Sequence, residues 1–128
     1  MDKALNENLP IYMQIMDRIR AAIVSGELRP GAKVATVREL AEDFGVNPNT
    51  MQRALSELER EGLLISERTS GRFVTHDRAV IDTVRREAAQ KIVGEFLQKM
   101  KELGFTREQI EVFFREAEVE DADADTAV

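Results

Sequence analysis

Only three residues, 45–47, separate two segments with helical periodicity, and this short connection constrains the fold more than any other feature. A capping box of Thr36 and Glu39 opens the first segment, and Gly45 is a natural left-handed stop for it. Asn47 is a typical N-cap for the second segment, and the proline after it fits the first helical turn. Two helices joined by so short a turn form a helix-turn-helix.

The second of these helices separates an apolar face from a polar one. Met51, Leu55 and Leu58 recur at i, i+4 and i+7, which predicts that they are buried. The opposite face carries amide, hydroxyl and guanidinium side chains: Asn49, Arg53, Ser56 and Arg60, with Gln52 at its flank. Asn and Gln pair bidentately with adenine in the major groove of DNA, and Arg pairs with guanine. The pattern therefore predicts a helix that contacts base edges.

The elements on either side of these helices complete a known arrangement. Isoleucines recur every four positions after Pro10 and predict a first helix: Ile11, Ile15, Ile19 and Ile23. Residues 28–31 predict a type II turn, and residues 33–34 predict a short strand. Residues 63–68 and 72–75, joined through a Ser-Gly tip, predict a hairpin. This order of elements is that of a winged helix-turn-helix.

From about Asp77 the period is helical again. One broad apolar face comprises Ala88, Ala89, Ile92, Val93, Phe96, Met100 and Leu103. Gly104 stops this helix, and a capping box of Thr106 and Gln109 opens a last one. That helix has a stripe of Ile110, Phe113, Phe114 and Ala117. Two such helices bury little against each other, so their aromatic residues need another surface, either the first domain or a second copy of the chain.

Dimerisation is the simpler of these two answers. Two copies related by a two-fold axis match a palindromic DNA site whose half-sites lie about one helical turn apart. The expected contact residues are Ile92, Phe96, Met100, Leu103, Ile110, Phe113 and Phe114.

The predicted fold is mainly α with a small β-wing. A winged helix-turn-helix DNA-binding domain spans residues 1–76, a short two-helix dimerisation region spans residues 77–118, and an acidic, disordered tail spans residues 119–128. Six carboxylates lie between Glu116 and Asp125 and account for much of the net charge of −6. Residues 1–75 carry ten Lys/Arg and eleven Asp/Glu, so the overall acidity does not exclude a basic patch on the first domain.

Composition excludes several other classes of protein. The chain is 43% apolar and 33% charged, and no apolar run approaches the roughly 20 residues that a membrane span needs. The N-terminus has no basic region followed by an apolar core, so we expect no secretory signal and a cytoplasmic location. With no cysteine there is neither a disulfide nor a thiolate metal site, and His76, the one histidine, is expected in a linker.

Enzymatic motifs are also missing from the sequence. It has no phosphate loop, no Cys–His nucleophile pair and no carboxylate cluster suited to acid–base work. We therefore expect a binding protein with no cofactor and no metal, rather than an enzyme.

Three stretches of the chain resemble the DNA-binding domain of the GntR family of bacterial transcriptional regulators. They are residues 36–41 (TVRELA), 44–50 (FGVNPNT) and 54–63 (ALSELEREGL). The segment VNPNTMQR and the brief two-helix C-terminal part look like the YtrA subfamily. The resemblance covers about residues 9–75 and rests on several motifs in order.

This resemblance implies DNA contacts from the start of the second helix, from the third helix and from the wing tip, which would enter the neighbouring minor groove. The matching residues are Thr36 and Arg38, then Asn47, Asn49, Thr50, Gln52 and Arg53, and last Ser70, Gly71 and Arg72. The chain departs from the family pattern at Ala35, where proline is usual, and in a wing that is less glycine-rich and less basic.

Several of these residues also have simpler explanations. Asn47 is an N-cap whatever the function, a role worth about 1 kcal/mol, and Thr50 is explained equally by a first-turn hydroxyl. Arg38 is able to pair with Glu42 at i, i+4, although we favour phosphate binding. For the exposed face of the third helix the simpler explanation is solvation, but the turn before it and the wing after it favour base contacts.

The leading hypothesis is a homodimeric, sequence-specific DNA-binding transcription regulator, a repressor on a palindromic operator. One alternative is a protein-interaction module in which the winged domain is only a scaffold. Another is a regulator controlled by a small effector at the dimer or interdomain seam, because the C-terminal helices leave little volume for a pocket of their own.

Overall fold

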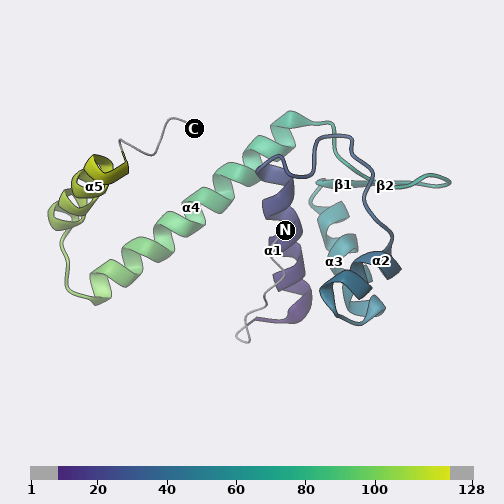
Figure 1. Ribbon diagram of the computed structural model, residues 1–128, viewed down its shortest axis with the longest axis horizontal. Coiled ribbons are helices and arrows are strands. Elements are labelled where there is room, and N and C mark those ends of the chain that lie inside the picture. The colour runs from purple at the N-terminus through teal and green to yellow at the C-terminus, as the bar shows by residue number, and fades with distance from the viewer. Residues whose placement is uncertain (1–8, 122–128) are drawn as a thin grey trace. The chain divides into compact units, whose positions relative to one another are not determined.

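The computed structural model describes residues 9–121, with side chains up to Glu118, and the chain divides after Arg86 into two compact units. The N-terminal unit contains α1 (Ile11–Val24), α2 (Val37–Phe44), α3 (Pro48–Arg60), β1 (Leu64–Glu67) and β2 (Gly71–Val74) (Figure 1). The helix α4 (Arg78–Glu102) begins in this unit and continues into the C-terminal unit, where α5 (Arg107–Asp121) follows. The predicted winged helix-turn-helix with two further helices is confirmed.

The first helix and the turn after it form largely as predicted. Ile15, Ile19 and Ile23 are buried, whereas Ile11 is exposed, so the stripe is buried only from its second member onward. In the turn, the Ala32 N–H donates to the Arg29 carbonyl at 3.0 Å, and Gly31 has a φ of 80°. These are the features of a type II turn, whose third position requires a positive φ. A Cβ at Gly31 would also overlap the His76 ring.

The helix-turn-helix connection has the predicted caps. The Glu39 N–H donates to the Thr36 hydroxyl at 3.2 Å, which caps α2. Gly45 ends that helix with a φ of 69°, in the left-handed region that favours glycine. The Asn49 N–H donates to the Asn47 side-chain oxygen at 2.7 Å, which caps α3. The caps therefore end α2 and begin α3 within the three residues 45–47.

The wing is a two-stranded antiparallel hairpin with a short third contribution. The strands β1 and β2 pair from Leu64 opposite Val74 to Glu67 opposite Gly71. The strand expected at residues 33–34 forms only a single bridge, between Lys33 and Phe73. The hairpin extends from the helices as a narrow projection (Figure 1).

The core of the N-terminal unit draws on every one of its elements. The largest of the fully buried side chains come from α1, α3 and the segments around the wing: Ile15, Ile19, Ile23, Met51, Leu55, Leu58, Leu63, Leu64 and Val74. Three residues of α2 join them, and so does Ile81 in the first turn of α4. Burying one such aliphatic side chain contributes roughly 1.5–3 kcal/mol, so this cluster stabilises the fold and holds α3 in place.

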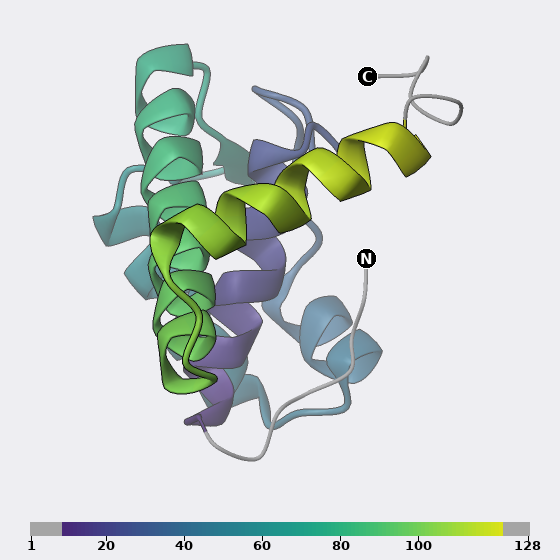
Figure 2. The same ribbon diagram turned by 90° about the vertical axis from the view of Figure 1, so that its left-hand side faces the viewer.

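The C-terminal unit is a helical hairpin with aromatic contacts. The chain turns at Gly104, which has a φ of 91°, and α5 crosses α4 obliquely (Figure 2). The predicted capping box forms with both hydrogen bonds between Thr106 and Gln109, at 2.9 and 3.3 Å. The helix α5 reaches Asp121, so it enters the segment 119–128 predicted as a tail; residues 122–128 lie outside the described part of the chain.

Ring contacts and one buried isoleucine hold this hairpin together. The ring centroids of Phe96 and Phe114 are 5.5 Å apart, and those of Phe105 and Phe113 are 5.2 Å apart at right angles. Ile110 is buried.

None of the helices within residues 9–121 combines the length and the apolar character that crossing a membrane requires.

Candidate nucleic-acid interface

The two faces of α3 separate as the periodicity predicts. Met51, Leu55 and Leu58 are fully buried. The side chains of the opposite face and its flank are all exposed: Asn49, Gln52, Arg53, Ser56 and Arg60. The helix packs against both α1 and α2 through its apolar side, so its polar face is left for a partner.

Asn47 and Thr50, at the start of α3, take part in the helix start and its packing. The oxygen of the Asn47 amide accepts the capping hydrogen bond, which confirms its structural role. Thr50 is half-buried, whereas Asn49 between them is exposed. The predicted DNA contacts of Asn47 and Thr50 stay predictions.

Two residues of the exposed face are oriented by neighbours. The Gln52 amide donates to the Ser56 hydroxyl one turn later, at 3.0 Å. The Arg53 guanidinium lies over the ring of Tyr12 in α1, with its central carbon 3.8 Å from the ring centroid. Sequence reasoning missed Tyr12, because a contact between residues of two different helices leaves no local pattern.

Arg38 stands exposed in the first turn of α2, close to Thr36. The pairing with Glu42 that would have explained it structurally does not form, and no other ion pair holds it among the residues the structure describes. Its charge is therefore free to meet a phosphate, the role that a basic side chain at the edge of such an interface typically has.

Arg72 of the wing is engaged within the protein. Its guanidinium donates to the Glu59 carboxylate of α3, and the Ser66 hydroxyl of β1 donates to the same oxygen. Burial raises the pKa of Glu59, but the hydrogen bonds from Ser66 and Arg72 and the charge of Arg72 outweigh it and bring the pKa below its usual value. Glu59 thus ties both strands of the wing to α3.

Other cations of the wing region are exposed. Arg68 lies in the hairpin turn and is exposed, as is Ser70 in the same turn. A Cβ at Gly71 would stand 3.4 Å from Cε of Lys33, so the lysine side chain lies over the wing backbone. Neither Lys33 nor Arg68 was predicted to contact DNA. The sequence feature that could have placed Lys33 near the wing is the short strand predicted at residues 33–34.

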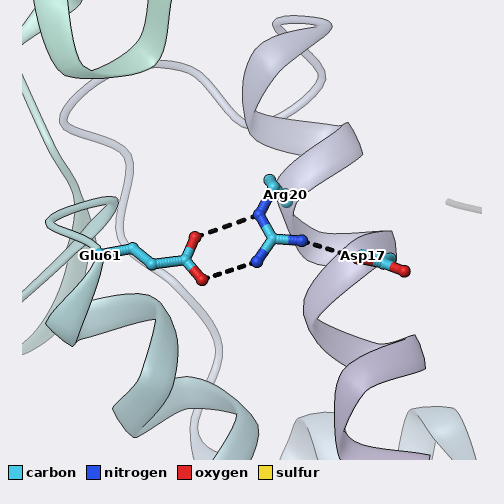
Figure 3. Close-up of polar contacts among 3 residues, drawn as sticks. All are labelled: Asp17, Arg20 and Glu61. Carbon is cyan, nitrogen blue, oxygen red and sulfur yellow. Dashed lines mark hydrogen bonds and ion pairs between the residues drawn. The ribbon is translucent and has the colours of Figure 1, made fainter. Parts of the chain in front are cut away.

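The far end of α3 is anchored to α1 by the ion pair in Figure 3. Arg20 donates to both carboxylate oxygens of Glu61, at 3.1 and 2.7 Å, and to Asp17 at 2.7 Å. Burial lowers the pKa of Arg20, but the hydrogen bonds and charges of Glu61 and Asp17 raise it above its usual value. A bidentate pair of this kind fixes geometry as well as charge, so it adds a polar contact between α3 and α1 to the apolar core that the two helices share.

Sequence comparison assigns this architecture to a family. The profile described as "Bacterial regulatory proteins, gntR family" matches residues 11–74, from the start of α1 to the end of β2. The chain belongs to the gntR family. It is 39% identical to the uncharacterized HTH-type transcriptional regulator YhcF of Bacillus subtilis over 110 residues, which are 86% of this chain and 91% of YhcF. It is 40% identical to the repressor YtrA of Bacillus subtilis over 68 residues, 53% of this chain and 52% of YtrA.

Solved structures agree with the assignment. A GntR family transcriptional regulator from Listeria monocytogenes superposes with a TM-score of 0.81 at 34% identity, covering 88% of this chain and 98% of that protein. The DNA-binding domain of AraR, solved with its operator, has a TM-score of 0.51 at 34% identity and covers 59% of this chain and 93% of that domain. The chain is therefore a YtrA-like transcription regulator of the gntR family and not an enzyme.

Proposed function

We propose that this gntR family regulator is a homodimeric repressor that binds a palindromic operator, with the exposed face of α3 in the major groove. The observation that carries the proposal is the face formed by Asn49, Gln52 and Arg53. It follows a three-residue turn, and the core uses none of these side chains. Amide and guanidinium groups are those that distinguish adenine and guanine by bidentate hydrogen bonds.

The surrounding residues supply the contacts that set the register of α3 on DNA. Arg38, with Thr36 beside it, binds a phosphate at the start of α2, and Asn47 and Thr50 approach the backbone at the start of α3. From the wing, Ser70 and Gly71 at the tip enter the minor groove. Arg72 donates to Glu59 and so supports the wing in the free protein, and its DNA contact stays a prediction.

The C-terminal unit supplies the dimer contact in this proposal. Ile92 and Leu103 are 65% and 71% exposed, and Phe113 and Phe114 remain about half exposed after their ring contacts. Phe96 and Met100 are half-buried beside them, and Ile110 is already buried within its own chain. Exposed apolar side chains on both helices of one unit favour an interface there. Binding to chromosomal DNA also implies a cytoplasmic location.

The repressor role is proposed from YtrA and from other repressors that the chain resembles in part, such as NagR of Bacillus subtilis at 37% identity over 98 residues. The chain spans about half of YtrA and 37% of NagR, so that role is transferred through the DNA-binding domain. Transcription in vitro from a promoter that overlaps a selected operator should fall when the protein is added. Increased transcription would contradict the repressor role but would not contradict DNA binding.

The decisive test of the interface begins with selection of bound sequences from a random DNA pool. On the selected operator, Arg53→Ala should weaken binding by about 1–3 kcal/mol and relax base preference at one position of each half-site. Arg38→Ala should weaken binding to all sequences alike, and it should reduce the slope of log affinity against log salt concentration by about one unit. Arg60→Ala is the matched control, because it removes the same charge from the last turn of α3, where Arg60 pairs with Glu57.

Two results would count against this interface. One is unchanged affinity and unchanged base preference in Arg53→Ala and Asn49→Ala together. The other is an Arg60→Ala variant that loses as much specificity as Arg53→Ala, since that would mean that any positive charge on α3 suffices.

A further inference from the structure

We propose that Tyr12 is a positioning residue for DNA recognition: its ring holds the Arg53 guanidinium in the orientation from which Arg53 contacts DNA. The inference rests on the proposed function, because it assumes that Arg53 meets the operator. It adds a residue of α1, outside the helix-turn-helix, to the determinants of sequence preference.

The contact leaves the hydrogen-bonding capacity of Arg53 intact. The guanidinium carbon lies 3.8 Å from the centroid of the Tyr12 ring, within the range of an attractive cation–π contact. The face of an aromatic ring accepts no conventional hydrogen bond, so the five N–H donors of the guanidinium stay available. Within the described part of the chain, no carboxylate forms an ion pair with Arg53.

Holding the side chain beforehand favours binding. A free arginine on a helix surface carries about 2 kcal/mol of rotamer entropy, part of which is lost when the side chain is immobilised on a base pair. Arg53 is exposed, yet the half-buried ring of Tyr12 restricts where its guanidinium lies. DNA therefore meets an arginine that is already oriented.

The position of Tyr12 under Arg53 is itself fixed by the fold. Arg20 and Glu61 form the anchor of Figure 3, eight residues beyond Tyr12 in α1 and eight residues beyond Arg53 in the α3 segment. Eight helical residues span about 12 Å, so α1 and α3 are joined at two points that match in register. The two contacts differ in kind: Arg20 meets a carboxylate and is fully engaged, whereas Arg53 meets a ring and keeps its donors.

Four variants of the full chain test the inference on the selected operator: Tyr12→Leu, Tyr12→Phe, Arg53→Ala and the double variant Tyr12→Leu/Arg53→Ala. Tyr12→Leu should lower operator affinity by about two- to fivefold, the size expected for losing an exposed cation–π contact. It should relax base preference at the same position that Arg53→Ala relaxes. In the Arg53→Ala background, Tyr12→Leu should have no further effect. Tyr12→Phe keeps the ring and should bind like the unmodified protein.

A matched control separates positioning from general loosening of the fold. Arg20→Met breaks the other joint between α1 and α3 and should lower the midpoint of thermal unfolding. It should leave the base preference at the Arg53 position unchanged, because the shared apolar core still holds α1 against α3. The thermal midpoints of the Tyr12 variants are measured alongside, and Tyr12→Phe provides a well-folded comparison if Tyr12→Leu is destabilised.

The outcomes distinguish this inference from the proposed function. If Arg53→Ala weakens binding but Tyr12→Leu does not, or if the two losses simply add, the positioning role is wrong and the function stands. If Tyr12→Phe binds as weakly as Tyr12→Leu, the hydroxyl rather than the ring acts, and the inference is again wrong. If Arg53→Ala binds like the unmodified protein, the proposed role of Arg53 fails and the inference fails with it.

Discussion

Both units of this protein contain capped helices, yet they differ in how far they bury their apolar side chains. The N-terminal unit surrounds one core with α1, α2, α3, the wing and the first turn of α4. The C-terminal unit pairs the rest of α4 with α5 and leaves Ile92 and Leu103 mostly exposed. Each of two paired helices buries only one apolar stripe against the other. Several elements around a common centre bury apolar side chains from more than one side.

This difference indicates that the two units have different roles. A unit that completes its own core presents a rigid surface, and here that surface is the polar face of α3. A unit that does not complete its core requires a further apolar surface, which a second copy of the chain provides in the proposed dimer. The following experiments compare the two units directly.

The largest difference should appear when one leucine is truncated in each unit. Leu55→Ala removes a fully buried side chain and should lower the free energy of unfolding by about 2–5 kcal/mol. Leu103→Ala removes one that is 71% exposed and, at protein concentrations where the chain is monomeric, should change it by no more than about 0.5 kcal/mol. Urea unfolding followed by circular dichroism measures both. Equal losses would contradict the contrast between the units.

The exposed face of α4 should matter for association instead. Ile92→Glu places a charge among the exposed apolar side chains and should raise the dimer dissociation constant by about thirtyfold or more, as for a central interface residue. Gln90→Glu adds the same charge to a position of α4 that is already polar, and it should have little effect. Sedimentation equilibrium decides between them. If Ile92→Glu dimerises like the unmodified chain, the proposed interface lies elsewhere.

The caps provide a finer comparison, since each unit has one threonine cap. Thr36→Ala and Thr106→Ala should each cost about 1 kcal/mol locally. Because α2 is part of the closed core, the loss from Thr36→Ala should appear in global unfolding. The loss from Thr106→Ala should appear as faster hydrogen exchange confined to the start of α5. Exchange that increases throughout the chain in Thr106→Ala would show that the two units unfold together.

The smallest effect concerns pH. The pKa of Glu59 is lower in the folded protein than its ordinary value of 4.5, so its contribution to stability is present above that value. This contribution is lost as pH falls through the folded pKa. Glu59→Gln should therefore reduce the stability at pH 7 slightly and flatten the decline on the acid side, measured by urea unfolding between pH 6 and about pH 3. Ser66→Ala removes one of the hydrogen bonds and should act in the same direction, less strongly. A steeper acid decline in Glu59→Gln would contradict the assignment.

Local sequence was enough to predict where the helices, the turns and the wing lie. Periodicity, the Thr36 and Thr106 capping boxes, Gly45 and the Asn47 cap act over a few residues, so each can be recognised without knowing the rest of the fold. The same periodicity was enough to separate the buried face of α3 from the exposed face proposed to contact DNA. The single bridge of Lys33 and the exposure of Ile11 were not predicted, because both depend on which neighbours are close enough to pair or to cover.

Tertiary structure alone decided how the polar side chains of this surface are held. Arg53 lies on Tyr12, Arg72 is bound to Glu59, and Arg20 is bound to Glu61. Residue type alone does not show which arginine has a partner within the protein. The three differ because the packing of α1 and the wing against α3 brings distant residues within reach, so the available partner, rather than the residue type, determines how each guanidinium is held.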